Sequence, residues 1–180
     1  MSEQVVKISD SWATPGALGL TGFSLSTIVL AFLNLGLAED AVTLIAMSIF
    51  VGGIAQFCAG LMAFKKGSTF DMVAFCGFGS FWISFAYILI TGAGANAVGI
   101  YLIVWALLAF ALTLGVIKLK ARALIGVLGL LTIVLIVSGI NSMIGGLAFV
   151  AGILALILGL LAFYTAMAIV LNEVGFKLPL

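Results

Sequence analysis

Long apolar runs fill most of the chain, and short polar or glycine-rich stretches separate them. A helix needs about 20 mostly apolar residues to cross the hydrocarbon core of a bilayer. Six segments reach that length, over about 17–37, 41–64, 72–91, 98–117, 124–140 and 146–171. Because only a few residues connect them, neighbouring helices are expected to run antiparallel. The pattern predicts an all-α membrane protein, in which residues 1–180 form a single integral membrane domain with six transmembrane helices.

The residues that flank these segments are typical of helix ends. Pro15 suits the first turn of a helix, where its missing N–H would have no partner, and Thr14 is expected to cap that turn. The fifth segment is expected to end at Asn141 and Ser142, ahead of Gly145. The loops are therefore short on both sides of the membrane.

Charge is scarce and unevenly placed. Hydrophobic residues make up 65% of the chain and charged residues 7%, against roughly 25% charged in soluble proteins, so a soluble fold is excluded. With six helices every basic residue falls on one side of the membrane, and the other side holds Glu39, Asp40 and uncharged loops. The positive-inside rule predicts a multi-pass protein of the cell membrane with both termini in the cytoplasm. The basic residues are Lys7, Lys65, Lys66, Lys118, Lys120, Arg122 and Lys177.

The composition also argues against several classes of function. The chain has no histidine, and its two cysteines, Cys58 and Cys76, lie in apolar surroundings. The usual ligands of zinc and haem and the usual imidazole base are therefore lacking. A net charge of +1 with no basic stripe argues against nucleic acid as a partner. We expect no enzyme activity, no metal and no other cofactor.

Mildly polar side chains recur inside several of the apolar segments, at spacings that place them on helical faces. The positions expected to line a shared path are Ser26, Thr27, Asn34, Gln56, Tyr164 and Asn172. Two structural interpretations compete with a path, because hydroxyls bond preceding carbonyls of their own helix and amides hold neighbouring helices together. Phe23 and Phe78 lie beside these polar positions, and core packing is the simpler interpretation of both from position alone.

No charged residue lies near the middle of any segment. Asp71 begins the third segment and Glu173 follows the sixth, both on the predicted cytoplasmic side. A proton-driven carrier usually places a carboxylate or histidine within the membrane. A permeating solute must here be held by hydroxyls, amides, backbone N–H groups or ring edges, which suits a small solute that leaves as easily as it enters.

Several motifs follow one another in the order of a known family. Residues 14–23 (TPGALGLTGF) resemble its entry motif, and residues 52–56 (GGIAQ) and 65–70 (KKGSTF) resemble the signature of its second span. Residues 79–82 (GSFW) continue that signature, and residues 171–173 (LNE) with the closing LPL are similar to its ending. The chain thus resembles the acetate uptake transporter family, also called the succinate–acetate permease family, over nearly its whole length.

This resemblance implies a hexamer in which each protomer has its own path for acetate or similar short monocarboxylates, with succinate accepted by some members. It also implies a hydrophobic constriction, whose three positions fall here on Phe23, Phe78 and Leu131. The second of these is a tyrosine in the family pattern, so this chain lacks a hydroxyl there.

We therefore expect a membrane channel or transporter in which the anion diffuses through the constriction, with acetate preferred over succinate. The partners expected are acetate, the lipid bilayer and further copies of the chain. Two alternatives stay open. One is an acetate/proton symporter that uses Asp71 or Glu173. The other is a channel for a small neutral solute such as a urea-like amide, which needs no charged site.

Overall fold

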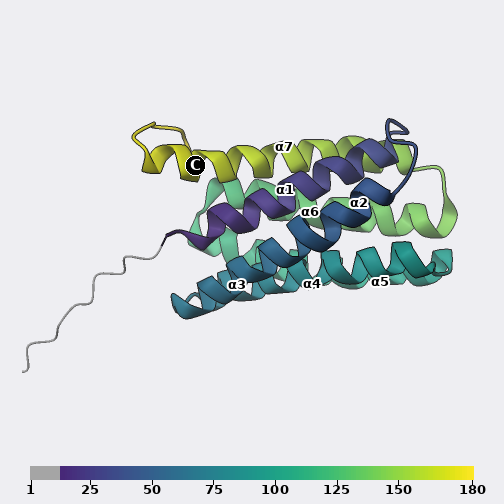
Figure 1. Ribbon diagram of the computed structural model, residues 1–180, viewed down its shortest axis with the longest axis horizontal. Helices are drawn as coiled ribbons and strands as arrows, with labels where there is room; N and C mark the ends of the chain where they lie inside the picture. Colours follow the sequence, from purple (N-terminus) through teal and green to yellow (C-terminus); the bar gives the residue numbers. More distant parts are fainter. Residues whose placement is uncertain (1–12) are drawn as a thin grey trace, which may run out of the picture.

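The computed structural model describes residues 13–180 (Figure 1), and Lys7 lies outside this range. The segments α2 (Val42–Met47), η1 (Ser48–Ala55) and α3 (Gln56–Lys65) follow one another without a break and form one long helical rod, so the bundle has six rods. Each of the six is long and apolar enough to cross a membrane, as the hydrophobic pattern predicts. The helices are α1 (Pro15–Asn34), α2 (Val42–Met47), η1 (Ser48–Ala55), α3 (Gln56–Lys65), α4 (Thr69–Thr91), α5 (Ala95–Leu119), α6 (Arg122–Ile144) and α7 (Ala148–Glu173).

Two details at the helix ends differ from expectation. Thr14 stands at the start of α1, with Pro15 in the first turn, but its side chain makes no capping hydrogen bond. Helix α6 does not end at Asn141 and runs on to Ile144, where Gly145 breaks it with a φ of 75°. The Asn141 side chain instead reaches across that turn, because its Oδ1 accepts a 2.8 Å hydrogen bond from the N–H of Leu147.

Close helix packing depends on small residues. Helix α1 packs along α7, α5 along α6, and α3 along α4 (Figure 1). A Cβ on Gly159 of α7 would lie 2.6 Å from Cγ1 of Ile28, and one on Gly22 of α1 would lie 2.5 Å from the carbonyl oxygen of Val51. In a bilayer no hydrophobic effect drives helices together, so association depends on close van der Waals packing. Small residues such as these allow that packing, because they let the helix backbones approach each other.

The second rod contains a π-helical stretch, η1. In a π-helix each N–H bonds the carbonyl five residues back, which widens the turn. The Ser26 hydroxyl donates a 3.0 Å hydrogen bond to the carbonyl of Met47, where η1 begins. Gly52 lies against the same serine and against Trp82, since a Cβ there would be 2.6 Å from Ser26 Oγ. This part of the rod is therefore tightly fixed to α1 and α4.

The charged side chains of the described residues lie at the ends of the rods. Lys65 and Lys118 are in the last turns of α3 and α5, and Asp71 is in the first turn of α4. The start of α1 and the C-terminal segment lie at this same end of the bundle (Figure 1). We call it the basic end, and we call the end with the loops 35–41, 92–94 and 145–147 the opposite end.

Candidate functional site

Three cavities follow one another through the bundle. The basic-end cavity has a volume of about 340 Å³, and its lining includes Thr14, Asp71, Lys120, Arg122, Thr165 and Leu180. The middle cavity, about 40 Å³, is lined by Leu20, Phe23, Gln56, Asp71, Phe78 and Leu131 among others. The far cavity, about 120 Å³, is lined by side chains that include Phe23, Thr27, Asn34, Trp82, Leu131, Ser138 and Asn141.

Shared wall residues place the cavities in sequence. Leu20 and Asp71 belong to both the basic-end and the middle cavity, whereas Phe23 and Leu131 belong to both the middle and the far cavity. The side chains of Phe23 and Leu131 are therefore what separates the two inner cavities. Phe78 completes this wall from the side of the middle cavity.

The structure brings together the three predicted constriction residues. Phe23, Phe78 and Leu131 are each at most 5% exposed. The rings of Phe23 and Phe78 meet edge to face, with centroids 6.4 Å apart and planes at 60°, the arrangement that aromatic pairs favour. Phe81 and Trp105 also pack near the ring of Phe78, with centroids 6.4 and 6.1 Å away.

Glycines of α1 set the position of Phe23. Gly19 faces the ring of Phe75 so closely that a side chain at this position would overlap the ring, and Gly22 contacts the backbone at Val51. Helix α1 therefore lies deep between η1, α4 and α7, and Phe23 projects into the centre of the bundle.

Three of the predicted polar residues line the inner cavities. Thr27 and Asn34 line the far cavity, where the Thr27 hydroxyl donates a 2.7 Å hydrogen bond to the carbonyl of Phe23. Gln56 lines the middle cavity and is 2% exposed, and its Oε1 accepts no hydrogen bond from any described residue. Ser26 is buried against η1 and lines none of the three cavities.

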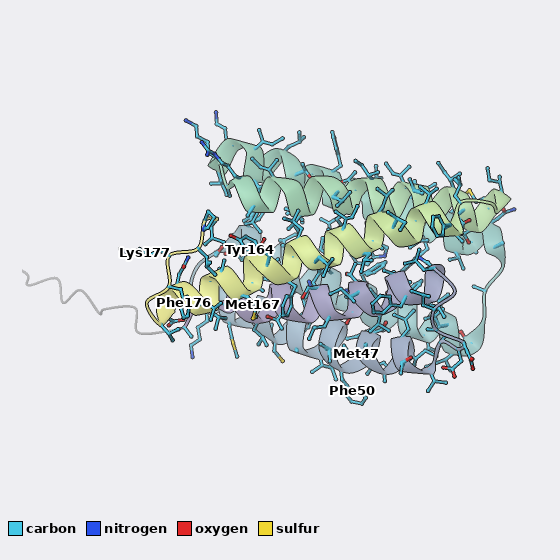
Figure 2. All side chains as sticks on the ribbon, turned by 90° about the horizontal axis from the view of Figure 1, so that it is seen from above. Met47, Phe50, Tyr164, Met167, Phe176 and Lys177 are labelled. Carbon is cyan, nitrogen blue, oxygen red and sulfur yellow. The ribbon has the colours of Figure 1, made fainter. Side chains whose placement is uncertain are left out.

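The structure places Tyr164 and Asn172 away from the three cavities. The Tyr164 hydroxyl donates to the carbonyl of Pro179 at 2.9 Å. The Asn172 amide bonds both the N–H and the carbonyl of Leu178, at 2.6 and 2.9 Å. Figure 2 shows Tyr164 beside the segment that carries Lys177. The two side chains hold the C-terminal segment against α7 and line none of the three cavities.

The two carboxylates at the basic end have different surroundings. Asp71 lines both the middle and the basic-end cavity, and its Oδ2 accepts a 2.7 Å hydrogen bond from the Ser68 hydroxyl. The Asp71 N–H donates back to Ser68 Oγ, which caps α4. Glu173 is exposed at the end of α7 and lines none of the three cavities.

Sequence reasoning missed several cavity residues. Trp82, Ser138 and Asn141 line the far cavity. Ser138 follows Leu131 by seven residues, which is two helical turns, and Trp82 follows Phe78 by one turn. The helical period counted from the constriction residues would have found both.

Six apolar helices enclose a row of cavities, and the charged side chains of residues 13–180 lie at the ends of the helices. This arrangement defines a membrane protein of the channel and transporter class. Residues 3–177 match the GPR1/FUN34/yaaH family, and the chain belongs to this family. This match confirms the family that the sequence motifs predict.

Named relatives and a solved structure agree with this assignment. The chain is 40% identical over 171 residues to the succinate-acetate/proton symporter SatP of Escherichia coli K12, covering 89% of this chain and 90% of the relative. It is 39% identical over 84 residues to acetate permease A of Emericella nidulans, covering 45% and 28% of the two chains.

The fold is that of the structure described as the bacterial acetate channel SatP, with a TM-score of 0.90 and 37% identity. That match covers 94% of this chain and 99% of the other. The chain is a multi-pass protein of the cell membrane, and the relatives named here are transporters or channels.

Proposed function

We propose that this protein conducts acetate and similar short monocarboxylates across the cell membrane. The observation that carries the proposal is the row of cavities, which narrows where Phe23 and Leu131 separate the middle from the far cavity. The names of the relatives, a succinate-acetate/proton symporter and an acetate permease, support the same solute class.

The constriction selects by size and hydration. Phe23, Phe78 and Leu131 offer no polar side-chain atom, so a solute sheds most of its water to pass them. Burying a charge without partners is costly, and a dianion sheds more hydration than a monoanion. We therefore expect acetate to pass more readily than succinate.

Polar groups on either side of the constriction replace the lost water. Gln56 lies on the side of the middle cavity, and Thr27 and Asn34 lie on the side of the far cavity. None of these side chains carries a fixed charge, so the solute is held weakly and is released readily.

For orientation and assembly we propose what the sequence leads us to expect. The positive-inside rule puts the basic end in the cytoplasm together with both termini, and the resemblance to the family implies a hexamer. Large apolar side chains such as Leu107 and Phe110 are exposed on the isolated bundle. They would face lipid or a neighbouring copy.

Of the two carboxylates at the basic end, Asp71 rather than Glu173 is placed to take part in proton coupling. Asp71 lies in the wall of two cavities, whereas Glu173 is exposed and lines neither of them. A symporter would move a proton with each acetate, and Asp71 is the carboxylate that the solute passes.

Uptake of radiolabelled acetate into liposomes that contain the purified protein tests the proposal. We expect saturable uptake that unlabelled propionate suppresses and that acetamide and urea leave largely unchanged. Suppression by the amides with no effect of propionate would assign the path to a neutral amide and overturn the proposal.

A further inference from the structure

Residues 174–180, which we call the strap, leave the end of α7 through a sharp turn. The N–H of Phe176 donates to the carbonyl of Leu171 at 3.0 Å, and the N–H of Gly175 donates to the carbonyl of Asn172 at 3.2 Å. These two bonds form a Schellman motif, which favours glycine because the chain there takes a positive φ. The φ of Gly175 is 104°. The turn ends α7 and lets the strap run back along it.

Two side chains of α7 clamp the strap to the helix. The Tyr164 hydroxyl donates to the carbonyl of Pro179 at 2.9 Å. The Asn172 amide accepts from the N–H of Leu178 at 2.6 Å and donates to its carbonyl at 2.9 Å. Figure 2 shows Lys177 in the segment that runs back past Tyr164. Since the two clamping residues are eight positions apart, about 12 Å along the helix, the strap is fixed from two places.

The clamped strap forms part of the wall of the basic-end cavity. Leu180 lines this cavity together with Thr14 at the start of α1 and Thr165 of α7. Leu180 is 53% exposed, so it lies at the rim of the cavity. Because Leu180 follows the two clamped residues directly, the hydrogen bonds of Tyr164 and Asn172 also fix its place in the wall.

The apolar strap shares the cavity with charged side chains. Lys120 and Arg122 contribute two positive charges to the lining and Asp71 one negative charge, which leaves one positive charge in the wall. Low-dielectric walls focus the field of such charges and raise the local concentration of ions of opposite sign. Water in place of the strap would weaken that field. A closed strap therefore favours the entry of an anion from the basic end.

We infer that Tyr164 and Asn172 are positioning residues for transport, which hold the strap as a wall of the basic-end cavity and so promote entry of the anion from that end. The inference rests on the proposed function. Neither side chain lines a cavity, and both act through the backbone of Leu178 and Pro179.

Trypsin cleavage after Lys177 in the purified full-length protein reports whether the strap is held. The bond that trypsin cuts joins Lys177 to Leu178, whose N–H and carbonyl are both bonded to Asn172. Cleavage therefore requires the strap to leave α7, and its rate follows the released population. Each hydrogen bond lost favours release about fivefold. We expect cleavage about fivefold faster in Tyr164→Phe and roughly 25-fold faster in Asn172→Ala.

Acetate uptake into liposomes adds a readout that a purely structural role would not move. The constriction at Phe23 and Leu131 is unchanged in both variants, so the maximal rate should stay close to that of the wild type. The half-saturating concentration should rise about threefold, comparable to the attraction of one positive charge for an anion about 6 Å away in water. A variant that only folds less well would lower the maximal rate and leave the half-saturating concentration unchanged.

Tyr87→Phe is the matched control. Tyr87 is 66% exposed on α4 and lines none of the three cavities, so the substitution removes the same hydroxyl away from the strap. Its cleavage after Lys177 and its half-saturating concentration should equal those of the wild type. Cleavage after Lys65, at the end of α3, is the internal reference and should be the same in every variant.

The outcomes separate this inference from the proposed function. Unchanged cleavage after Lys177 in Tyr164→Phe and Asn172→Ala shows that the clamps do not hold the strap and overturns the inference. Faster cleavage with an unchanged half-saturating concentration also overturns it, and the proposed function stands. A wild-type protein that passes no acetate overturns the proposed function and the inference with it. If Asn172→Ala does not fold, Tyr164→Phe alone decides, because it removes one hydroxyl from an exposed side chain.

Discussion

Removing the ring of Phe78 should both destabilise the bundle and widen the path. The ring is 3% exposed and packs against Phe23, Phe81 and Trp105. Deleting a buried phenylalanine ring costs about 3–5 kcal/mol. We expect the lower part of that range for Phe78→Ala, because the ring already borders a 40 Å³ cavity on one side.

The same substitution should relax the size limit. Acetate and butyrate differ by two methylenes, each worth about 0.8 kcal/mol of apolar burial. When the widened wall accommodates both methylenes, butyrate is stabilised in the constriction by about 1.6 kcal/mol relative to acetate. Its uptake rate relative to that of acetate then rises more than tenfold. The assay is the ratio of butyrate to acetate uptake in liposomes, measured on one preparation so that the amount of folded protein cancels.

The control removes the same ring from an exposed site. Phe110 on α5 is 53% exposed, so Phe110→Ala should leave the uptake ratio unchanged. If Phe78→Ala folds and its butyrate-to-acetate ratio equals that of the wild type, Phe78 takes no part in the constriction and the reasoning is refuted.

Three further outcomes are expected. Gly52→Ala should lower the free energy of unfolding by about 1–3 kcal/mol, because the new Cβ would lie 2.6 Å from Ser26 Oγ and 2.8 Å from Trp82 Cγ; an unchanged melting temperature in detergent would contradict this packing. Asp71→Asn should alter the rate of acetate uptake, because Asp71 lines two of the cavities, whereas Glu173→Gln should not, and the opposite result would show that the carboxylate met by the solute is on α7. Succinate should enter liposomes more slowly than acetate at equal concentration, and equal or faster entry would show that the constriction does not select against a dianion.

Much of the fold could be predicted from the sequence, because the bilayer imposes a simple rule on length and polarity. The six helices follow from apolar runs of sufficient length. Their ends were harder to predict, since Asn141 is a residue typical of turns yet continues α6 and bonds Leu147 across the turn at Gly145. Thr14 has the right type for a cap but its side chain makes no such bond.

The site was only partly predictable. Helical period placed Phe23, Thr27 and Asn34 on one face, and all three line the far cavity. Period alone did not reveal which face meets another helix, so Ser26 was expected to line the path although its hydroxyl donates to the carbonyl of Met47 at the end of α2.

Tyr164 and Asn172 line none of the three cavities for another reason. Their hydrogen-bond partners are in the C-terminal segment, which folds back against α7. No local pattern in the sequence announces that contact, since a polar residue near a helix end suits a path and a backbone clamp equally well.

The central claim is that acetate crosses each bundle as an anion, through a path that has no fixed charge at its centre. Acetate uptake into liposomes under an imposed voltage, at equal pH on both sides, tests this most directly. One elementary charge gains about 2.3 kcal/mol per 100 mV, so an inside-positive potential of that size should raise acetate accumulation roughly 50-fold. Accumulation that ignores the voltage and responds only to a pH gradient would contradict the account, because acetate would then cross together with a proton.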